Sequence, residues 1–281
     1  MRRVVQLAFT IALLGSAELA QAEPMRLFFF SPDFSPGNLS VLAQAADAYF
    51  RESKADTRFQ AFVRFEDFER EFLAQKPEFV LVPDWANDTL CLGSEFRALA
   101  KPVRAGESHG RKALIARPTV RRVADIAKGS IAATMTPGGP ASGSALDRIR
   151  RDHPGVRIIP VPKEIDALLA VAFGQVDAAF VSTGQVDLLA GVSPKLGTDL
   201  KEIGYAESTP FPMIYATAYA TDEQAEDVRS ALSSVASTGT GKRLIGLLGY
   251  DDWVLVGSAE AAKRRTKSTA SMCGPSKESA K

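Results

Sequence analysis

The feature that most constrains the fold is a regular alternation of short apolar segments with segments of helical periodicity. Strands are predicted at residues 25–30, 59–64 and 79–82, which are rich in Phe, Val and Leu. Between them, residues 38–51 and 66–74 place apolar side chains three and four positions apart, as on one face of a helix. Buried strands that alternate with helices predict a parallel sheet covered by helices.

The same alternation returns in a second block of different sequence. Strands are predicted at 112–116, 130–134, 156–161 and 178–181, and helices at 120–126, 144–151 and 165–173. After residue 203 follow a strand at 213–219, helices at 223–236 and 242–248, and a strand at 253–256. These last elements are too few for a third sheet with its own core, so we expect them to return to the first block.

The sequence therefore predicts an α/β protein of two lobes, the second inserted in the first, with a two-strand hinge. Lobe 1 is assigned residues 23–104 and 205–261, and lobe 2 residues 105–204. The crossings between lobes are expected near residues 101–105 and 202–206. A double-stranded hinge lets two rigid lobes close over a ligand. This order is the topology of a bilobal binding protein.

Residues 1–22 have the order of an export signal. Arg2 and Arg3 precede the apolar stretch 4–14, and small side chains follow near Ala20 and Ala22. The stretch is shorter than the roughly 20 apolar residues that a membrane-spanning helix needs. We therefore expect the signal peptide to be cleaved and the remaining chain to work in the periplasm, which N-terminal sequencing of the exported protein tests.

The charge balance gives no reason to expect a nucleic-acid partner. The chain has 34 Lys+Arg and 33 Asp+Glu, and loss of Arg2, Arg3 and Glu18 with the signal leaves 32 of each. Residues 262–281 hold six basic residues and one acidic residue, so the body of the protein is mildly acidic. We expect residues 262–281 to be a disordered basic tail and the protein to be a monomer.

The cysteines and histidines support neither a metal nor another cofactor. Cys91 and Cys273 are the only cysteines, and they either form a disulfide or remain as one buried thiol and one thiol in the tail. His109 and His153 are the only histidines, and they stand far apart without neighbouring cysteines. A zinc or copper site therefore has little support.

Two enzyme motifs fail at defined positions. Residues 139–143 place the serine one position away from that of the hydrolase nucleophile elbow. Residues 236–243 depart from a phosphate-binding loop at Ala236 and Arg243. The sequence therefore predicts no catalysis.

Several stretches keep the motif order of a known family. They are Ala98 to Arg104, Arg111 to Arg117, Val123 to Ser130, Thr136 to Ser144, Ala167 to Val181, Pro210 to Met213, and Gly241 to Val256. They are similar to the phosphate, phosphite and phosphonate branch of the substrate-binding proteins of ABC importers, over about Arg26 to Val256. The resemblance implies a type II bilobal fold, a small anionic ligand and a membrane permease as partner. Segments 31–38 and 83–90 depart from the family's pocket pattern, which leaves the ligand open.

The loop 136–144 is the first candidate for ligand binding. In sheets of this kind, ligands sit beyond the carboxyl ends of strands, where loops lead into helix N-termini. Ser142, Gly143 and Ser144 can present hydroxyl and N–H groups to an oxyanion at such a helix end. The alternative is that Ser142 or Ser144 only caps the helix.

Other candidates follow the remaining strands of the predicted sheets. They are Ser31, Ser35, Asp84 and Trp85 in lobe 1, and Ser182 and Thr183 in lobe 2. Trp85 offers a flat apolar wall with one N–H, or else is a packing aromatic. Asp84 either receives an ammonium group or caps the next helix.

Three functions are compatible with these features. The first is an extracytoplasmic solute-binding protein that captures a phosphonate-, phosphite- or phosphate-like solute for an ABC importer. The second is a bilobal periplasmic sensor or accessory protein without a transport role, and the third is an enzyme on the same scaffold. Titration with phosphate, phosphite, methylphosphonate, sulfonates and small carboxylates separates the first from the others.

Overall fold

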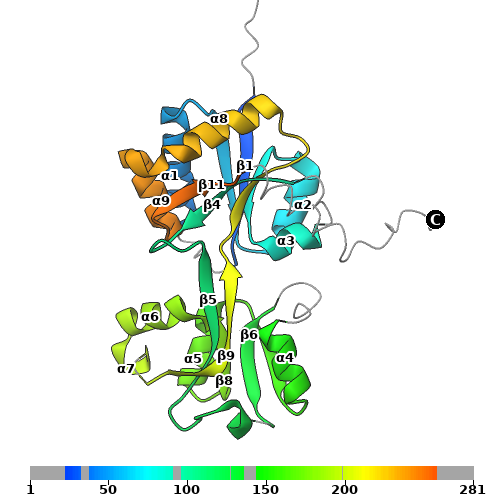
Figure 1. The fold of residues 1–281 in the computed structure, drawn as a ribbon, viewed down its shortest axis with the longest axis vertical. Helices are drawn as coiled ribbons and strands as arrows, with labels where there is room; N and C mark the ends of the chain where they lie inside the picture. The colour runs from blue at the N-terminus through cyan, green and yellow to red at the C-terminus, as the bar shows by residue number, and fades with distance from the viewer. Residues whose placement is uncertain are drawn as a thin grey trace, which may run out of the picture.

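The computed structural model describes residues 23–32, 38–90, 96–126, 128–135, 144–197 and 199–257. These residues form two lobes joined by a pair of extended segments (Figure 1). The predicted signal peptide and basic tail, and also Cys91 and Cys273, lie outside the described residues. Within the described part of the chain, no helix is long and apolar enough to cross a membrane.

The first lobe is built on a six-stranded sheet of order β11-β4-β10-β3-β1-β2. Its strands are β1 (Met25–Phe30), β2 (Thr57–Phe62), β3 (Phe79–Val82), β4 (Arg97–Val103), β10 (Met213–Ala216) and β11 (Asp252–Leu255). Its helices are α1 (Leu39–Glu52), α2 (Phe65–Gln75), α3 (Asp84–Thr89), α8 (Asp222–Ser233), η3 (Val235–Ser237) and α9 (Gly239–Leu248). Strands β1, β2 and β3 run parallel, and β10 is antiparallel to β3 and β4.

Strand β1 shows why this sheet is covered on both faces. Leu27 and Phe29 belong to the core that also contains buried residues of α1, α8 and α9. Phe28 and Phe30 point to the other core, which contains the buried face of α2. All four side chains are buried. The continuous apolar run is therefore that of a strand between two helix layers.

The second lobe is built on a five-stranded sheet of order β7-β6-β8-β5-β9. Its strands are β5 (His109–Ala116), β6 (Ser130–Thr134), β7 (Arg157–Val161), β8 (Ala178–Ser182) and β9 (Lys201–Pro210). Its helices are η2 (Val123–Ile126), α4 (Ala145–Asp152), α5 (Glu164–Ala172), α6 (Thr183–Val192) and α7 (Pro194–Gly197). Strands β6, β7 and β8 are parallel, while β5 is antiparallel to both β8 and β9.

The inserted order of the lobes is confirmed. The whole second sheet lies in the chain between β4 and β10, two strands that belong to the first sheet. The second crossing falls later than predicted, because β9 pairs with β5 as far as Pro210 opposite His109. Residues 205–210 thus belong to the second sheet, whereas the sequence placed them in lobe 1. Strand β9 was not predicted because its many polar residues give no continuous apolar run.

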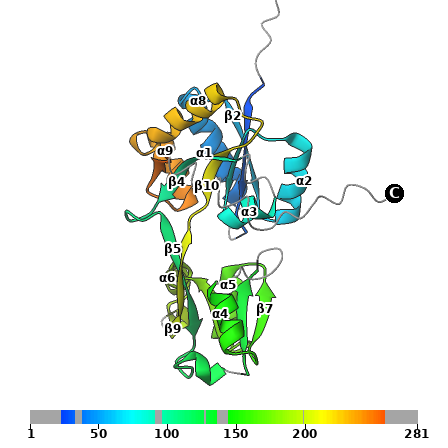
Figure 2. The same cartoon turned by 45° about the vertical axis from the view of Figure 1, so that its right-hand side comes forward.

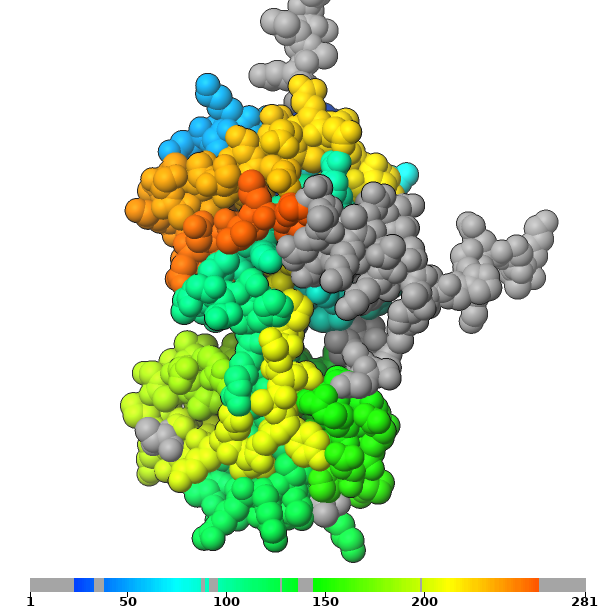
Figure 3. All heavy atoms as spheres, in the orientation of Figure 1, coloured from blue at the N-terminus to red at the C-terminus, as the bar shows by residue number. Residues whose placement is uncertain are grey.

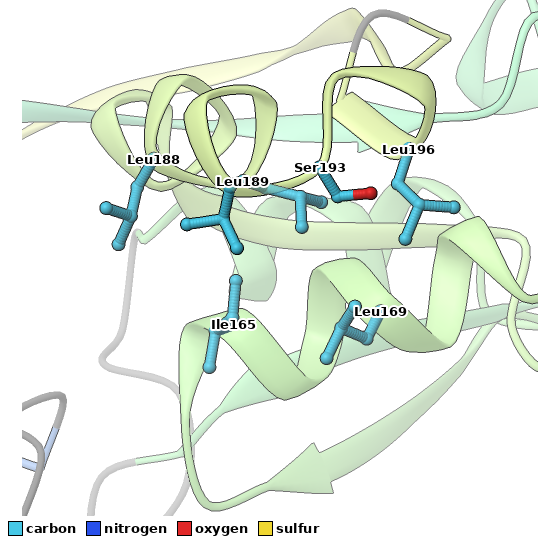
Figure 4. A pocket seen from close by; sticks show the side chains of 7 residues that line it. Ile165, Leu169, Leu188, Leu189, Ser193 and Leu196 are labelled. Atoms are coloured by element: carbon cyan, nitrogen blue, oxygen red, sulfur yellow. The ribbon is translucent and has the colours of Figure 1, made fainter.

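Helix α6 and its neighbours enclose an apolar hollow on the second lobe. The hollow has a volume of about 290 Å³ and is lined by Ile165, Leu169, Leu188, Leu189, Val192, Ser193 and Leu196. Figure 4 shows side chains of α5 pointing toward those of α6 and α7. The only polar side chain in the lining is a serine. This hollow is therefore unsuited to hold an oxyanion.

Candidate ligand-binding site

The strand-end edges of the two sheets face each other across the hinge. Helix α3 follows β3 on the side of the upper lobe that is turned toward the lower lobe (Figures 1 and 2). In the second sheet, α4, α5 and α6 follow the parallel strands β6, β7 and β8, so their N-termini share one edge. Figure 3 shows the molecule narrowing between the lobes at the two crossing segments. The predicted site residues that the structure describes therefore lie along these edges; they are Ser31, Asp84, Trp85, Ser144, Ser182 and Thr183.

Trp85 packs on an aromatic cluster of the first lobe. Its ring centre lies 5.5 Å from that of Phe30, at an interplanar angle of 90°, and 5.2 Å from that of Phe65. Phe30 is buried, whereas Trp85 is half-buried. The structure thus packs Trp85 against these aromatic rings and leaves the residue half-buried.

Asp84 is tied to the strand that leads back from the second lobe. Its carboxylate Oδ1 accepts a hydrogen bond of 2.7 Å from the hydroxyl of Tyr215 on β10. Asp84 is also the first residue of α3, where a negative charge is favourable. Ser31 follows β1, and its N–H donates to the carbonyl of Phe62 at 3.1 Å. Ser35 lies outside the described residues.

Ser144 is the N-cap of α4. Its Oγ accepts a hydrogen bond of 3.2 Å from the N–H of Asp147, which confirms the capping role among the two predicted for it. The next N–H, that of Ala145, donates to Oε2 of Glu207 at 2.6 Å. Ser142 and Gly143 lie outside the described residues. The start of α4 is therefore capped by both a hydroxyl and a carboxylate.

A polar row crosses three neighbouring strands at the same edge. Lys112 on β5 is in register with Ser182 on β8 and with Glu207 on β9. Residues directly opposite each other in antiparallel strands project to the same face, with Cβ atoms about 5 Å apart. Ser182 was a predicted site residue, whereas Lys112 and Glu207 were not. Ser182 is also the N-cap residue of α6, which begins at Thr183.

The buried carboxylate of Glu164 contacts two residues of this row, Ser182 and Lys112. Oε2 of Glu164 accepts the N–H of Ser182 at 2.9 Å, and Oε1 lies 2.7 Å from Nζ of Lys112. The Glu164 side chain is 2% exposed and that of Lys112 is 25% exposed. Glu164 opens α5, so the positive helix end also stabilises its charge. Sequence reasoning missed Glu164, although an acidic residue directly before an apolar helix was a usable signal.

The hinge contains a stacked arginine. The guanidinium carbon of Arg104 lies 5.4 Å from the ring centre of Phe211 and 5.3 Å from that of Tyr250. Its Nε donates to the carbonyl of Gly249 at 2.6 Å. Arg104 follows β4 in the first crossing, and Phe211 follows β9 in the second. The stack thus joins both crossings to the end of α9 in the first lobe.

The stack predicts a pH dependence of stability. Burial raises the pKa of Tyr250 from 10.0 to about 12, although the charge of Arg104 acts in the opposite direction. The folded state then binds more protons than the unfolded state, so the free energy of unfolding falls as pH rises from about 10 to about 12. Urea unfolding in alkaline buffers should show a smaller loss for Tyr250→Phe than for the wild type. Identical losses would contradict the assignment, because the other tyrosines are the same in both proteins.

The two histidines lie at different places in the second lobe. His109 begins β5 and its Nδ1 is 3.1 Å from the hydroxyl of Ser108. His153 follows α4, with Nε2 at 3.3 Å from the hydroxyl of Tyr205. Among the residues that the structure describes, no group of three or more His, Cys, Asp or Glu could hold a metal ion.

The fold and the opposed strand-end edges define a bilobal binding protein of type II. Solved structures of similar fold include a binding protein component of an ABC phosphonate transporter from Pseudomonas aeruginosa (TM-score 0.64, 16% identity, covering 86% of this chain and 84% of that chain). PhnD1 from Prochlorococcus marinus in complex with methylphosphonate is also similar (TM-score 0.67, 8% identity, 87% and 98%). XAC2383 from Xanthomonas citri bound to chloride ion is a third (TM-score 0.69, 12% identity, 88% and 96%).

Residues 28–260 match the model of a family described as ABC transporter, phosphonate, periplasmic substrate-binding protein. Because the match spans most of the sequence, the chain belongs to this family of substrate-binding proteins. A comparison with curated proteins found no match. The family predicted from the sequence motifs is therefore confirmed.

Proposed function

We propose that this protein captures a small oxyanion-bearing solute of the phosphonate, phosphite or phosphate class between its lobes and delivers it to the permease of an ABC importer. The observation that carries the proposal is the convergence of three helix N-termini, those of α4, α5 and α6, on the edge that faces the first lobe. Helix N-termini present N–H groups and a positive potential, which favour anions. Methylphosphonate bound to PhnD1, a protein of similar fold, supports this class of ligand.

The residues proposed to contact the ligand come from both lobes. In the second lobe they are Ser182 and Thr183 after β8, and Ser142, Gly143 and Ser144 before α4. In the first lobe they are Ser31, Ser35, Asp84 and Trp85. The half-buried ring of Trp85 would lie against the organic group, and the serine hydroxyls would bind the oxyanion.

The proposed cellular context follows from the family and the first residues of the chain. Residues 1–22 would be cleaved as a signal peptide, and the protein would act in the periplasm as a monomer. Its partners would be the solute and the permease, with no nucleic acid.

Removing two hydroxyls tests the proposed site. Calorimetric titration with methylphosphonate should show at least about a tenfold loss of affinity for the double variant Ser144→Ala/Ser182→Ala, because each lost hydrogen bond contributes about 1 kcal/mol. The cap of α4 is also lost, at a cost of about 1 kcal/mol of stability, so titration is done well below the melting temperature. Ser233→Ala on α8 is the matched control. The proposal would be contradicted if the wild-type protein bound none of phosphate, phosphite, methylphosphonate, sulfonates and small carboxylates.

A further inference from the structure

Two carboxylates accept hydrogen bonds from backbone N–H groups at the edge where the ligand is proposed to bind. Glu207 accepts the N–H of Ala145 at 2.6 Å, and Glu164 accepts the N–H of Ser182 at 2.9 Å. Both N–H groups are at the start of helices that face the first lobe. An oxyanion at this edge must therefore lie beside these carboxylates or take the place of one of them.

The two carboxylates differ in how their charges are compensated. Glu164 is paired with Lys112 at 2.7 Å. Asp147, in the first turn of α4, lies 3.5 Å from Arg151. Among the described residues, Glu207 has no cationic group within ion-pair distance, although Lys112 is opposite it in register. Within the described part of the chain, Glu207 thus places a negative charge without an ion pair at the start of α4.

We propose that Glu207 sets the charge selectivity of the ligand site by disfavouring doubly charged oxyanions more strongly than singly charged ones. A like charge within about 4–6 Å opposes binding, and it does so twice as strongly for a dianion as for a monoanion. The helix end and Lys112 still attract an anion, but Glu207 offsets part of that attraction. The inference rests on the proposed function and deepens it, since it names the residue by which the site discriminates between charge states of its ligand.

Neutralising Glu207 tests the inference. Methylphosphonate and methanesulfonate are titrated by calorimetry in alkaline buffer, where the first carries two negative charges and the second carries one. Glu207→Gln should raise the affinity for methylphosphonate by about tenfold or more, and it should raise the affinity for methanesulfonate clearly less. The glutamine oxygen can still accept the N–H of Ala145, so α4 should keep its cap.

Two controls separate charge from structure. Glu202→Gln removes the same charge from the same strand, about 17 Å away at 3.3 Å per residue, and should leave both affinities unchanged. Melting temperatures of the three proteins confirm that each is folded, and Glu207→Ala provides a second neutral variant.

The outcomes distinguish this inference from the proposed function. Wild-type binding of either anion, with equal or no gain in Glu207→Gln, would overturn the charge selectivity and keep the binding function. A loss of affinity in Glu207→Gln would also overturn it, since the carboxylate would then be a ligand contact that accepts a proton from the solute. Failure of wild type and variants to bind any oxyanion would overturn both.

Discussion

Replacing Glu164 with Ala is expected to destabilise the second lobe by about 1–3 kcal/mol, because it removes the buried partner of Lys112 and the acceptor of a backbone N–H. The ammonium of Lys112 would lose the carboxylate at 2.7 Å, and the N–H of Ser182 would lose its acceptor at 2.9 Å. The same change would release the corner between β8 and α6 that carries Ser182 and Thr183. Equilibrium urea unfolding measures the first effect, and titration with methylphosphonate measures the second.

An exposed ion pair of the same lobe provides the matched control. Glu202 pairs with Arg111, and their side chains are 37% and 50% exposed. Glu202→Ala should therefore cost no more than about 1 kcal/mol. Glu164→Gln adds a second comparison, since its amide oxygen still accepts the N–H of Ser182 while the ion pair is lost. A Glu164→Ala variant as stable as Glu202→Ala would show that the buried pair is not stabilising the lobe.

Much of the fold could be predicted because many of its strands can be recognised from their local sequence. Residues 25–30, 79–82 and 130–134 are short apolar runs, and the structure places strands at those positions. Amphipathic spacing likewise located α1, whose buried residues recur at helical intervals from Leu42 to Phe50. The inserted lobe followed from counting the elements after residue 203, which are too few for a separate core.

The elements that were missed lack such local signals. Helix α3 begins directly after β3 and has only six residues. Helix α6 buries Leu189 alone among its described residues, so it shows no apolar stripe. The predicted helix at 120–126 is a single 3₁₀ turn at Val123–Ile126. Strand β9 pairs with β5 through backbone hydrogen bonds, which do not require apolar side chains, so the sequence of β9 alone does not reveal the strand.

Only the part of the site that local sequence position reveals was predicted. Ser182 and Ser144 stand at strand and helix ends, and position alone made them candidates. Lys112, Glu164 and Glu207 are separated by dozens of residues. The register of β5 and β9 places Lys112 opposite Glu207, and the packing of α5 against β8 brings Glu164 to Lys112. A sequence without its strand pairing cannot show which carboxylate meets which lysine, so the charged part of the site emerged only from the structure.

The other large effect is expected for Phe30→Ala, in the aromatic cluster beneath Trp85. Phe30 is 1% exposed, and its ring centre lies 5.5 Å from those of Phe65, Phe68 and Trp85. Truncating a buried phenylalanine removes its transfer free energy and leaves a cavity, which together cost about 3–5 kcal/mol. Equilibrium urea unfolding should show this loss.

The same variant links the core of the first lobe to ligand binding. With Phe30 gone, Trp85 loses a ring that fixes its orientation at the strand-end edge, so the affinity for methylphosphonate should fall together with stability. Phe173→Ala is the matched control, because Phe173 is 65% exposed and its loss should change stability by no more than about 0.5 kcal/mol. If Phe30→Ala loses stability but binds as tightly as the wild type well below its melting temperature, Trp85 is a packing residue alone and the organic group of the ligand lies elsewhere.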